Sequence, residues 1–197
     1  MSDISIEQIK KLKSATGVGL TDAKKALQEA EGDFDKALEA MRIKGLARAD
    51  KKADREASAG MVHAYVHGGK IGVLVELNCE TDFVARTDDF KVLANDLALH
   101  IAASSPVYLD VDSIPEADLK KEQDLFAAEV KEQGKPDNMV EQIVSGKINK
   151  WQSEVCLLKQ PFVKDPDQTV EEVIKAGIAK LGENIILRQY SRVELGA

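Results

Sequence analysis

The sequence of 197 residues has few cysteines, few aromatic residues and no long apolar run. Its two cysteines, Cys79 and Cys156, lie far apart and form no CxxC pair, which is typical of a reduced protein with ordinary thiols. No uncharged apolar stretch reaches the roughly 18 residues of a membrane-spanning helix. The first residues, MSDISIEQ, lack the basic and then apolar pattern of a secretory signal. We therefore expect a cytoplasmic protein without a membrane partner.

Positive charge is scarce relative to negative charge. The net charge is −7 and the pI about 5.1, which argues against a general nucleic-acid binder, because such proteins displace counterions from phosphates with a dense positive field. The charge is also unevenly distributed. Residues 1–55 carry twelve Lys or Arg and ten Asp or Glu, whereas residues 56–197 carry fifteen and twenty-four. This break predicts two domains, an N-terminal one over 1–55 and a core domain over 56–197.

The motifs that bind phosphate or carry catalysis are missing too. The chain contains no GxxxxGK[ST], GxGxxG, GxSxG or HExxH pattern. His63 and His67 lie four positions apart, but on a predicted strand and without an identifiable third ligand. Cys79 has no identifiable base to activate its thiol. We therefore expect no catalytic residue, no metal and no cofactor. A metal-dependent or thiol enzyme that uses these three residues is an alternative supported by residue types alone.

Residues 1–55 have the pattern of three short helices. Apolar residues recur at helical spacing in each of them, and Gly17 and Gly32 are placed to end the first two. Such a compact bundle has little core, which is more typical of a docking module than of an enzyme. The basic stretch 42–55 is interpreted as a solvated linker or helix extension, or else as a contact strip for an acidic partner. The expected helix caps are Ser5 with Gln8, then Thr21, then Asp33.

Residues 56–197 mix strands and helices without regular alternation. An alternating hairpin begins this domain, and its return strand is apolar on both faces at its centre, which indicates an interior strand. Two amphipathic helices separated by Gly134-Lys135-Pro136 predict an antiparallel helical hairpin. We therefore predict an α+β fold with an antiparallel sheet. The predicted elements are strands over 61–66 and 71–78, a helix capped by Thr87, a short strand over 106–109, the helical hairpin over about 115–158, a helix from Thr169 to Gly182, and a strand over 185–195.

The segment Thr81-Asp82-Phe83-Val84, called the TDFV segment below, places a bulky apolar residue in a polar stretch. Neither a helical nor a strand period gives Phe83 an obvious core position. In one interpretation Phe83 folds back onto its own protein and Asp82 caps the next turn. In the other, Phe83 projects outward between hydrogen-bonding groups and enters a cleft of another protein, because aromatic residues often dominate the centres of interfaces.

The stretch GVLVELNCETDFVAR, the stretch GKPDNMVEQIVSGKINKW and several others resemble bacterial elongation factor Ts. The resemblance covers nearly the whole chain, and the length is similar to that of the family's short form, which carries one core half where longer members carry two. GVLVELNCETDFVAR is close to the family's most distinctive stretch. TGVGLTDAKKAL and GDFDKALEAMRIKG resemble its UBA-like domain, a three-helix domain of the ubiquitin-associated type. The other similar segments are GKPDNMVEQIVSGKINKW, KQPFVKD and KLGENIILRQYSRVELG.

The resemblance implies a guanine nucleotide exchange factor rather than an enzyme. Members of the family bind the GTPase elongation factor Tu and speed the release of GDP, so that GTP can enter. The resemblance also implies that the TDFV segment inserts between helices of the partner's nucleotide domain and disturbs its Mg²⁺ site. The residues carried over by motif are Thr81, Asp82, Phe83 and Val84 for this insertion, and Leu12, Val18, Gly19 and Leu20 for docking of the N-terminal domain on the same partner domain. At Leu20 the family usually has a methionine, so the volume is conserved.

A second copy of the chain is another expected partner. With one core half, the sheet is expected to leave an edge and an apolar face exposed, which a second copy could cover. The resemblance implies a homodimer and a complex of two plus two with elongation factor Tu, without direct contact to nucleic acid. A different class of function stays open at this point: an adaptor that binds ubiquitin-like or other small folded proteins through the N-terminal bundle, with the rest as scaffold.

Overall fold

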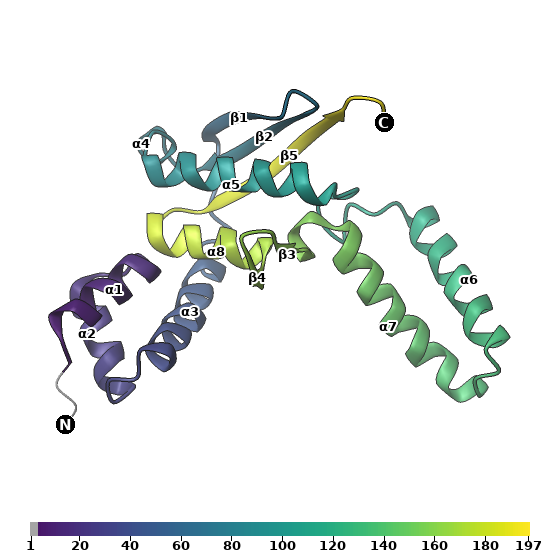
Figure 1. Ribbon diagram of the computed structural model, residues 1–197, viewed down its shortest axis with the longest axis horizontal. Helices are drawn as coiled ribbons and strands as arrows, with labels where there is room; N and C mark the ends of the chain where they lie inside the picture. The colour runs from purple at the N-terminus through teal and green to yellow at the C-terminus, as the bar shows by residue number, and fades with distance from the viewer. Residues whose placement is uncertain (1–3) are drawn as a thin grey trace. The chain divides into compact units, whose positions relative to one another are not determined.

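A computed structural model describes residues 4–197 and confirms the α+β class (Figure 1). Residues 1–3 of the predicted N-terminal domain lie outside the described residues. The chain divides into two compact units. The first comprises the N-terminal part up to Leu99 together with Glu172–Ala197, and the second comprises His100–Glu171. The boundary predicted near residue 55 therefore falls inside the first unit, which contains both the N-terminal helices and the sheet.

The first unit begins with three helices, and two of them start as their local sequence predicts. Before α1 (Ile6–Thr16), the Ser5 hydroxyl accepts from the Gln8 backbone N–H at 3.1 Å, and the Gln8 side chain accepts from the Ser5 N–H at 3.0 Å. This is the predicted capping box. Before α3 (Phe34–Asp50), the Asp33 carboxylate accepts from two backbone N–H groups at 3.1 Å. Both caps satisfy N–H groups that have no partner inside the helix.

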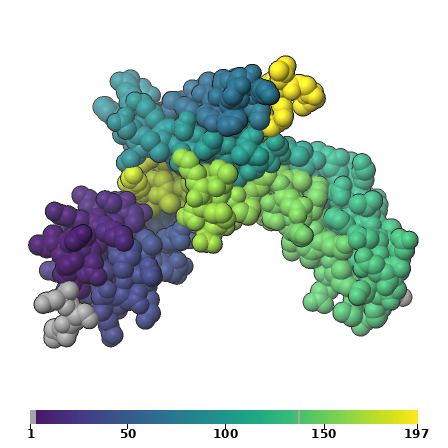
Figure 2. All heavy atoms as spheres, viewed as in Figure 1, coloured from purple at the N-terminus to yellow at the C-terminus, as the bar shows by residue number. Residues whose placement is uncertain are grey.

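The second helix begins differently from the prediction. α2 (Leu20–Glu29) starts after Gly19, which has no side chain to form a cap, and Thr21 lies inside the first turn. Because α3 continues to Asp50, most of the basic stretch 42–55 is a helix extension. The three helices pack around a core of their own, and Figure 2 shows their atoms gathered in one group. The buried residues of this core are Leu12, Ala23, Ala26, Leu27, Ala37 and Met41.

The first unit also contains a three-stranded antiparallel sheet in the order β1-β2-β5. Its strands are β1 (Ala59–His67), β2 (Ile71–Cys79) and β5 (Ile185–Glu194). The predicted hairpin is confirmed, and the Lys70 N–H donates to the His67 carbonyl at 3.0 Å across its turn. β2 pairs with both other strands, as its apolar pattern predicted, so β1 and β5 form the two edges.

One face of this sheet is buried. Along β2 the most buried residues alternate with more accessible ones, because neighbouring side chains of a strand point to opposite faces. α5 (Asp88–Ser104) and α8 (Val170–Leu181) supply further buried side chains to the first unit. These two helices pack closely, since a Cβ added at Gly177 of α8 would lie 2.8 Å from the Leu93 side chain of α5. Small residues such as Gly177 therefore set the distance between them.

The other face of the sheet is open and carries several exposed apolar residues. Cross-strand pairing places residues of β1, β2 and β5 in common rows on this face, for example Val66, Gly72 and Val193. Leu74, at the centre of the face, is 50% exposed. We call this region the open sheet face, and its exposed large apolar residues are Val62, Val66, Leu74, Ile186 and Val193.

The second unit contains the predicted helical hairpin. α6 (Glu116–Glu132) and α7 (Asp137–Val155) run side by side and are joined through Gly134, which has a positive φ of 68° (Figure 1). The Lys147 ammonium group lies 2.8 Å from the Glu129 carboxylate and links the two helices. The break at Gly134-Lys135-Pro136 thus separates the helices where the sequence predicts it.

Short elements complete the second unit. The strand predicted over 106–109 is wrong, because this stretch forms only a single parallel bridge, between Tyr108 and Cys156. A small two-stranded sheet appears instead in a region where the sequence predicted no strand, because one strand has only two residues and the other, DPDQT, contains no large apolar residue. The sheet consists of β3 (Pro161–Phe162) and β4 (Asp165–Thr169). The 3-10 helix η1 (Leu157–Lys159) precedes it.

His100, the first residue of the second unit, is fully buried. Its Nδ1 accepts from the Val163 backbone N–H at 3.1 Å, so the ring proton lies on Nε2, which donates to the Gln160 side-chain oxygen at 2.9 Å. Burial lowers the pKa of His100, although the bond to Gln160 acts in the opposite direction. The neutral ring is therefore part of the internal hydrogen bonding of this unit.

Candidate protein-interaction site

The TDFV segment follows β2 and forms one helical turn rather than an irregular loop. This turn, α4 (Asp82–Ala85), contacts β1 and β2. Ala85 is buried, whereas Phe83 is 86% exposed, the largest value among the described large hydrophobic residues. Residues two positions apart on a helix lie on nearly opposite sides, which explains the difference. The interpretation in which Phe83 folds back onto its own protein is therefore wrong.

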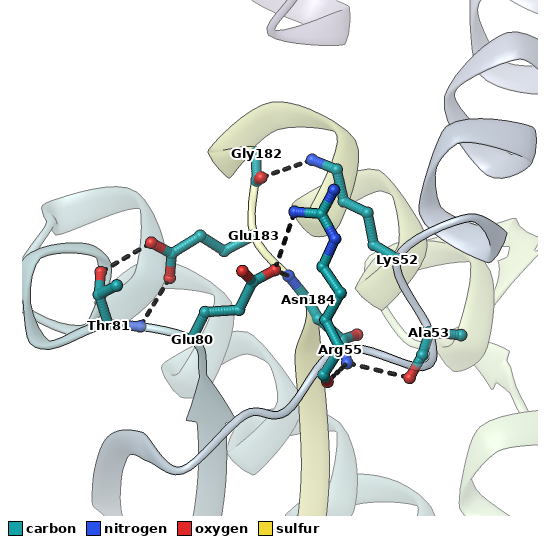
Figure 3. Close-up of polar contacts among 8 residues, drawn as sticks. All are labelled: Lys52, Ala53, Arg55, Glu80, Thr81, Gly182, Glu183 and Asn184. Atoms are coloured by element: carbon teal, nitrogen blue, oxygen red, sulfur yellow. Dashed lines mark hydrogen bonds and ion pairs between the residues drawn. The ribbon is translucent and has the colours of Figure 1, made fainter.

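The start of the turn is held by a carboxylate from a distant part of the chain (Figure 3). The Thr81 backbone N–H donates to Oε2 of Glu183 at 2.9 Å, and the Thr81 hydroxyl donates to Oε1 of Glu183 at 2.7 Å. The Thr81 carbonyl accepts from the Ala85 N–H and from the Cys79 thiol, both at 3.2 Å. Every polar group of Thr81 thus has a partner within the protein, which leaves its backbone little freedom.

The end of the turn is held by the residues that begin α5. The Thr87 hydroxyl donates to the Val84 carbonyl at 2.8 Å and accepts from the Phe90 N–H at 3.3 Å. Thr87 therefore caps α5, as predicted, and also closes the TDFV segment. Phe90 is fully buried, so this end is fixed to the core. Between the two ends, a guanidinium nitrogen of Arg86 lies 3.6 Å from a carboxylate oxygen of Asp82, and both side chains are exposed.

A second contact joins the TDFV region to the start of β5 (Figure 3). The carboxylate of Glu80, the residue before the segment, accepts from the Asn184 backbone N–H at 2.7 Å and lies 3.5 Å from the Arg55 guanidinium. This contact could not be predicted from the sequence, because Glu80 and Asn184 are 104 positions apart. Glu80 and Asn184 lie in two segments that carry the family resemblance, GVLVELNCETDFVAR and KLGENIILRQYSRVELG, but the resemblance does not mark them as partners.

The start of β5 is also bonded to the stretch that follows α3 (Figure 3). The Asn184 side-chain amide donates to the carbonyls of Ala53 and Arg55, at 3.1 and 2.7 Å. The Lys52 ammonium group donates to the Gly182 carbonyl. Residues 182–184 therefore have hydrogen-bond partners both after the N-terminal helices and at the TDFV segment.

The docking surface predicted on the N-terminal helices is exposed in part. Leu20 is 52% exposed, and a Cβ added at Gly19 would meet no atom within 4 Å, so this turn lies at the surface. Val18 is partly buried against the three-helix core. Leu12 is 0% exposed and belongs to that core, so we correct it from a docking residue to a core residue. Helical spacing alone did not show which of the apolar residues in this small bundle are covered.

The residues of the enzyme alternative do not form a reactive site. The Nδ1 of His67 lies 3.0 Å from the Tyr65 hydroxyl, and His63 is half-buried on the same strand. Burial raises the pKa of the Cys79 thiol, and the charge of Glu183 acts in the same direction, which disfavours the thiolate that a nucleophile needs. Among the side chains that the structure describes, no group of three or more His, Cys, Asp or Glu is placed to hold a metal ion. None of the described helices has the length and apolar character to cross a membrane.

Comparison with known proteins points to a single family. The family model described as Elongation factor TS matches residues 2–197. A protein named Elongation factor Ts from Carboxydothermus hydrogenoformans is 51% identical over 194 residues, which cover 98% of this chain and 89% of the relative. Proteins of the same name from Moorella thermoacetica and Herpetosiphon aurantiacus are 50% identical over 194 residues and 49% identical over 195 residues. These two matches cover 98% of this chain and 96% and 98% of the relatives.

Proposed function

The chain belongs to the elongation factor Ts family of translation elongation factors, and from this premise we propose that it binds the GDP-bound GTPase elongation factor Tu and promotes the exchange of GDP for GTP. The observation that carries the proposal is Phe83, an exposed aromatic side chain on a turn whose two ends are hydrogen-bonded to the protein. Because translation takes place in the cytoplasm, the proposed role agrees with the expected location.

Exchange requires that the factor and the nucleotide weaken each other's binding. If the factor binds the nucleotide-free partner more tightly than the GDP-bound partner, the factor must by reciprocity lower the affinity for GDP. A cleft that opens only without nucleotide and takes up Phe83 would supply this difference. Burying such a ring contributes roughly 1.5–3 kcal/mol, which corresponds to about ten- to hundredfold faster release of GDP.

The conformation of α4 favours this insertion because Phe83 is already presented to solvent. A side chain that becomes ordered only on binding costs about 0.5–1.5 kcal/mol. In the free protein the backbone on either side of Phe83 is held through Thr81 and Thr87. Insertion therefore needs little additional ordering of the turn, and it breaks few contacts of a ring that is 86% exposed.

A larger acceleration needs a second contribution, which we assign to the Mg²⁺ ion of the partner. Mg²⁺ requires near-ideal octahedral geometry, so a small shift of the surrounding backbone weakens its hold on the nucleotide phosphates. In this proposal Phe83 displaces a helix of the partner. The exposed carboxylate of Asp82 then stabilises the shifted backbone by hydrogen bonds, without touching the metal. Thr81 and Val84 supply the backbone groups that hold the two ends of the turn.

A second contact with the partner is assigned to the turn Val18-Gly19-Leu20. This turn joins α1 to α2, and its Leu20 side chain is 52% exposed, so it is accessible to a partner. Two contacts on one partner strengthen binding more than either alone, because the first holds the second near its target. The TDFV segment then acts on the nucleotide, while the N-terminal turn adds affinity.

We further propose that a second copy of the chain covers the open sheet face, so that the complex with elongation factor Tu contains two copies of each protein. The face carries five exposed large apolar side chains, and the carboxylate of Glu76 on its central strand β2 accepts from the Gln189 side chain at 2.7 Å within the same face. A twofold axis through such a face brings the same aliphatic residues of both copies together. The face is then removed from water, which favours association.

The test of the exchange proposal is the rate of GDP release from elongation factor Tu. Phe83→Ala should slow this release by about ten- to hundredfold, because the burial of the ring is lost. The melting temperature should stay unchanged, since the ring contacts little of its own protein. Val107→Ala, at an exposed apolar residue of the second unit, is the matched control and should exchange at the wild-type rate. A Phe83→Ala protein as fast as the wild type would contradict the proposal.

A further inference from the structure

We infer that Glu183 is a positioning residue for nucleotide exchange: its carboxylate holds Thr81 and thereby fixes the direction in which Phe83 projects. The inference rests on the proposed function of the TDFV segment and deepens it. Both carboxylate oxygens of Glu183 accept from Thr81, at 2.9 Å from the backbone N–H and 2.7 Å from the hydroxyl. Hydrogen bonds to a charged acceptor are shorter and stronger than those between neutral groups.

The turn depends on this contact because it is too short to be stable alone. α4 has four residues, and its N-cap residue Thr81 makes no side-chain bond to the turn itself. Starting a helix is unfavourable, because several residues must be ordered for the first hydrogen bond. The far end is held by Thr87, so the near end depends on Thr81 and on what holds it. Phe83 lies two residues beyond Thr81, so motion at Thr81 becomes motion of the ring.

Glu183 can hold Thr81 because its own backbone is fixed on both sides. Before it, the Gly182 N–H donates to the Ile178 carbonyl at 2.9 Å, and Gly182 ends α8 with a φ of 83°. After it, the Asn184 N–H donates to Glu80 at 2.7 Å, and the Asn184 side chain is buried. Figure 3 shows the Glu183 side chain extending from this segment toward Thr81. The contact is therefore supported by fixed structure at both of its ends.

Substitutions of Glu183 should slow exchange in proportion to the bonds that they remove. Glu183→Ala removes both acceptors and should slow GDP release by about tenfold, because Phe83 must then be ordered on binding. Glu183→Gln keeps the side-chain length but only one carbonyl oxygen, so we expect a smaller loss. Thr81→Val removes the hydroxyl donor and keeps the backbone N–H, and should resemble Glu183→Gln. The measurement is release of fluorescent GDP from elongation factor Tu, with the full chain in each case.

A double-mutant cycle with Phe83→Ala separates positioning from a general structural effect. If Glu183 acts through Phe83, Glu183→Ala should slow exchange little further in a protein that already carries Phe83→Ala. Hydrogen exchange of the Thr81 and Ala85 amides, whose N–H groups are hydrogen-bonded in the structure, should become faster in both Glu183 variants, while the melting temperature stays unchanged. Additive losses of rate, or unchanged amide protection, would overturn the inference.

A control variant, together with the results for Phe83→Ala, distinguishes a failure of the proposed function from a failure of the positioning role of Glu183. Glu129 on α6 also accepts from two side chains, Lys147 at 2.8 Å and Gln133 at 3.2 Å, so Glu129→Ala should leave exchange at the wild-type rate. If Phe83→Ala exchanges normally, the proposed function fails. If Phe83→Ala is slow but Glu183→Ala is as fast as the wild type, only the positioning role fails. If Glu183→Ala does not fold, Glu183→Gln and Thr81→Val decide by the same criteria.

Discussion

Two exposed apolar regions of the first unit are built in different ways. The TDFV segment presents one aromatic ring on a single turn that distant residues hold in place. The open sheet face presents several aliphatic side chains on three paired strands, which need no further support. A single ring can enter and leave a narrow cleft, whereas a broad aliphatic surface favours lasting association. The TDFV segment is therefore suited to a partner that binds and dissociates again. The open sheet face is suited to a partner that stays bound.

The largest effect should come from a charge on the open sheet face. Leu74→Glu would place a carboxylate from each copy in the proposed interface, and burying unpaired charges is costly, so the dimer dissociation constant should rise by at least about a hundredfold. Sedimentation at micromolar concentration should show a change from dimer to monomer. Leu125→Glu, the same change at a leucine of α6 that is 59% exposed, should leave the dimer intact.

The same experiment shows whether the two regions are independent. Phe83→Ala should leave the dimer unchanged, because Phe83 lies outside the open sheet face. Leu74→Glu should retain the GDP release that depends on the TDFV segment. A wild-type chain that sediments as a monomer would contradict the assignment of the open sheet face to a second copy. A Phe83→Ala protein that loses its dimer would contradict the separation of the two roles.

Two leucines of the N-terminal helices, Leu12 and Leu20, should give effects of intermediate size. Leu20 is a third exposed apolar site, beside the TDFV segment and the open sheet face. Leu12→Ala removes a fully buried side chain and should lower the free energy of unfolding by about 2–5 kcal/mol, measured by urea denaturation. Leu20→Ala, at an exposed position, should leave stability unchanged but raise the factor concentration for half-maximal exchange by about two- to tenfold. Equal losses of stability in both variants would contradict the assignment of Leu20 to the surface contact.

The smallest effect should be a pH dependence of stability that involves neither exposed region. Because burial lowers the pKa of His100 below its ordinary value of 6.5, the unfolded chain binds a proton between these two values and the folded chain does not. The contribution of His100 to stability is therefore fully present above pH 6.5 and decreases as the pH falls below it. Melting temperatures between pH 7.5 and 5.5 measure this decrease.

The variant His100→Asn is the control for this pH dependence. Its side-chain oxygen can accept from the Val163 N–H in place of Nδ1, but it does not titrate. The decrease in melting temperature below pH 6.5 should therefore be smaller in the variant than in the wild type. An identical decrease in both proteins would show that other groups cause it.

Features that depend on neighbouring residues could be predicted from the sequence. The caps at Ser5 and Asp33, the β-hairpin and the break at Gly134 each follow from residue types within a few positions. The unusual position of Phe83 was also visible, because a bulky apolar residue in a polar stretch fits neither a helical nor a strand core. Its exposure in the structure agrees with the outward interpretation.

Features that depend on distant residues could not be predicted. Thr81 and Glu183 are 102 positions apart, and neither residue type marks the other as its partner. The burial of Leu12 depends on how three helices meet, whereas helical spacing shows only that a face is apolar. The cap predicted at Thr21 is wrong, because α2 begins two residues earlier than predicted, after Gly19. Local patterns thus predicted most of the longer helices and strands, whereas tertiary contacts determine which of their residues are exposed.

The exposure of Phe83 has a consequence for how this protein can change during evolution. Residues that serve function are often tied to folding, so that gains in activity reduce stability. An aromatic ring that is 86% exposed contributes little to the fold of its own chain. Natural variation at this one position could therefore adjust the speed of the proposed nucleotide exchange over a wide range, without compensating substitutions elsewhere to keep the protein folded.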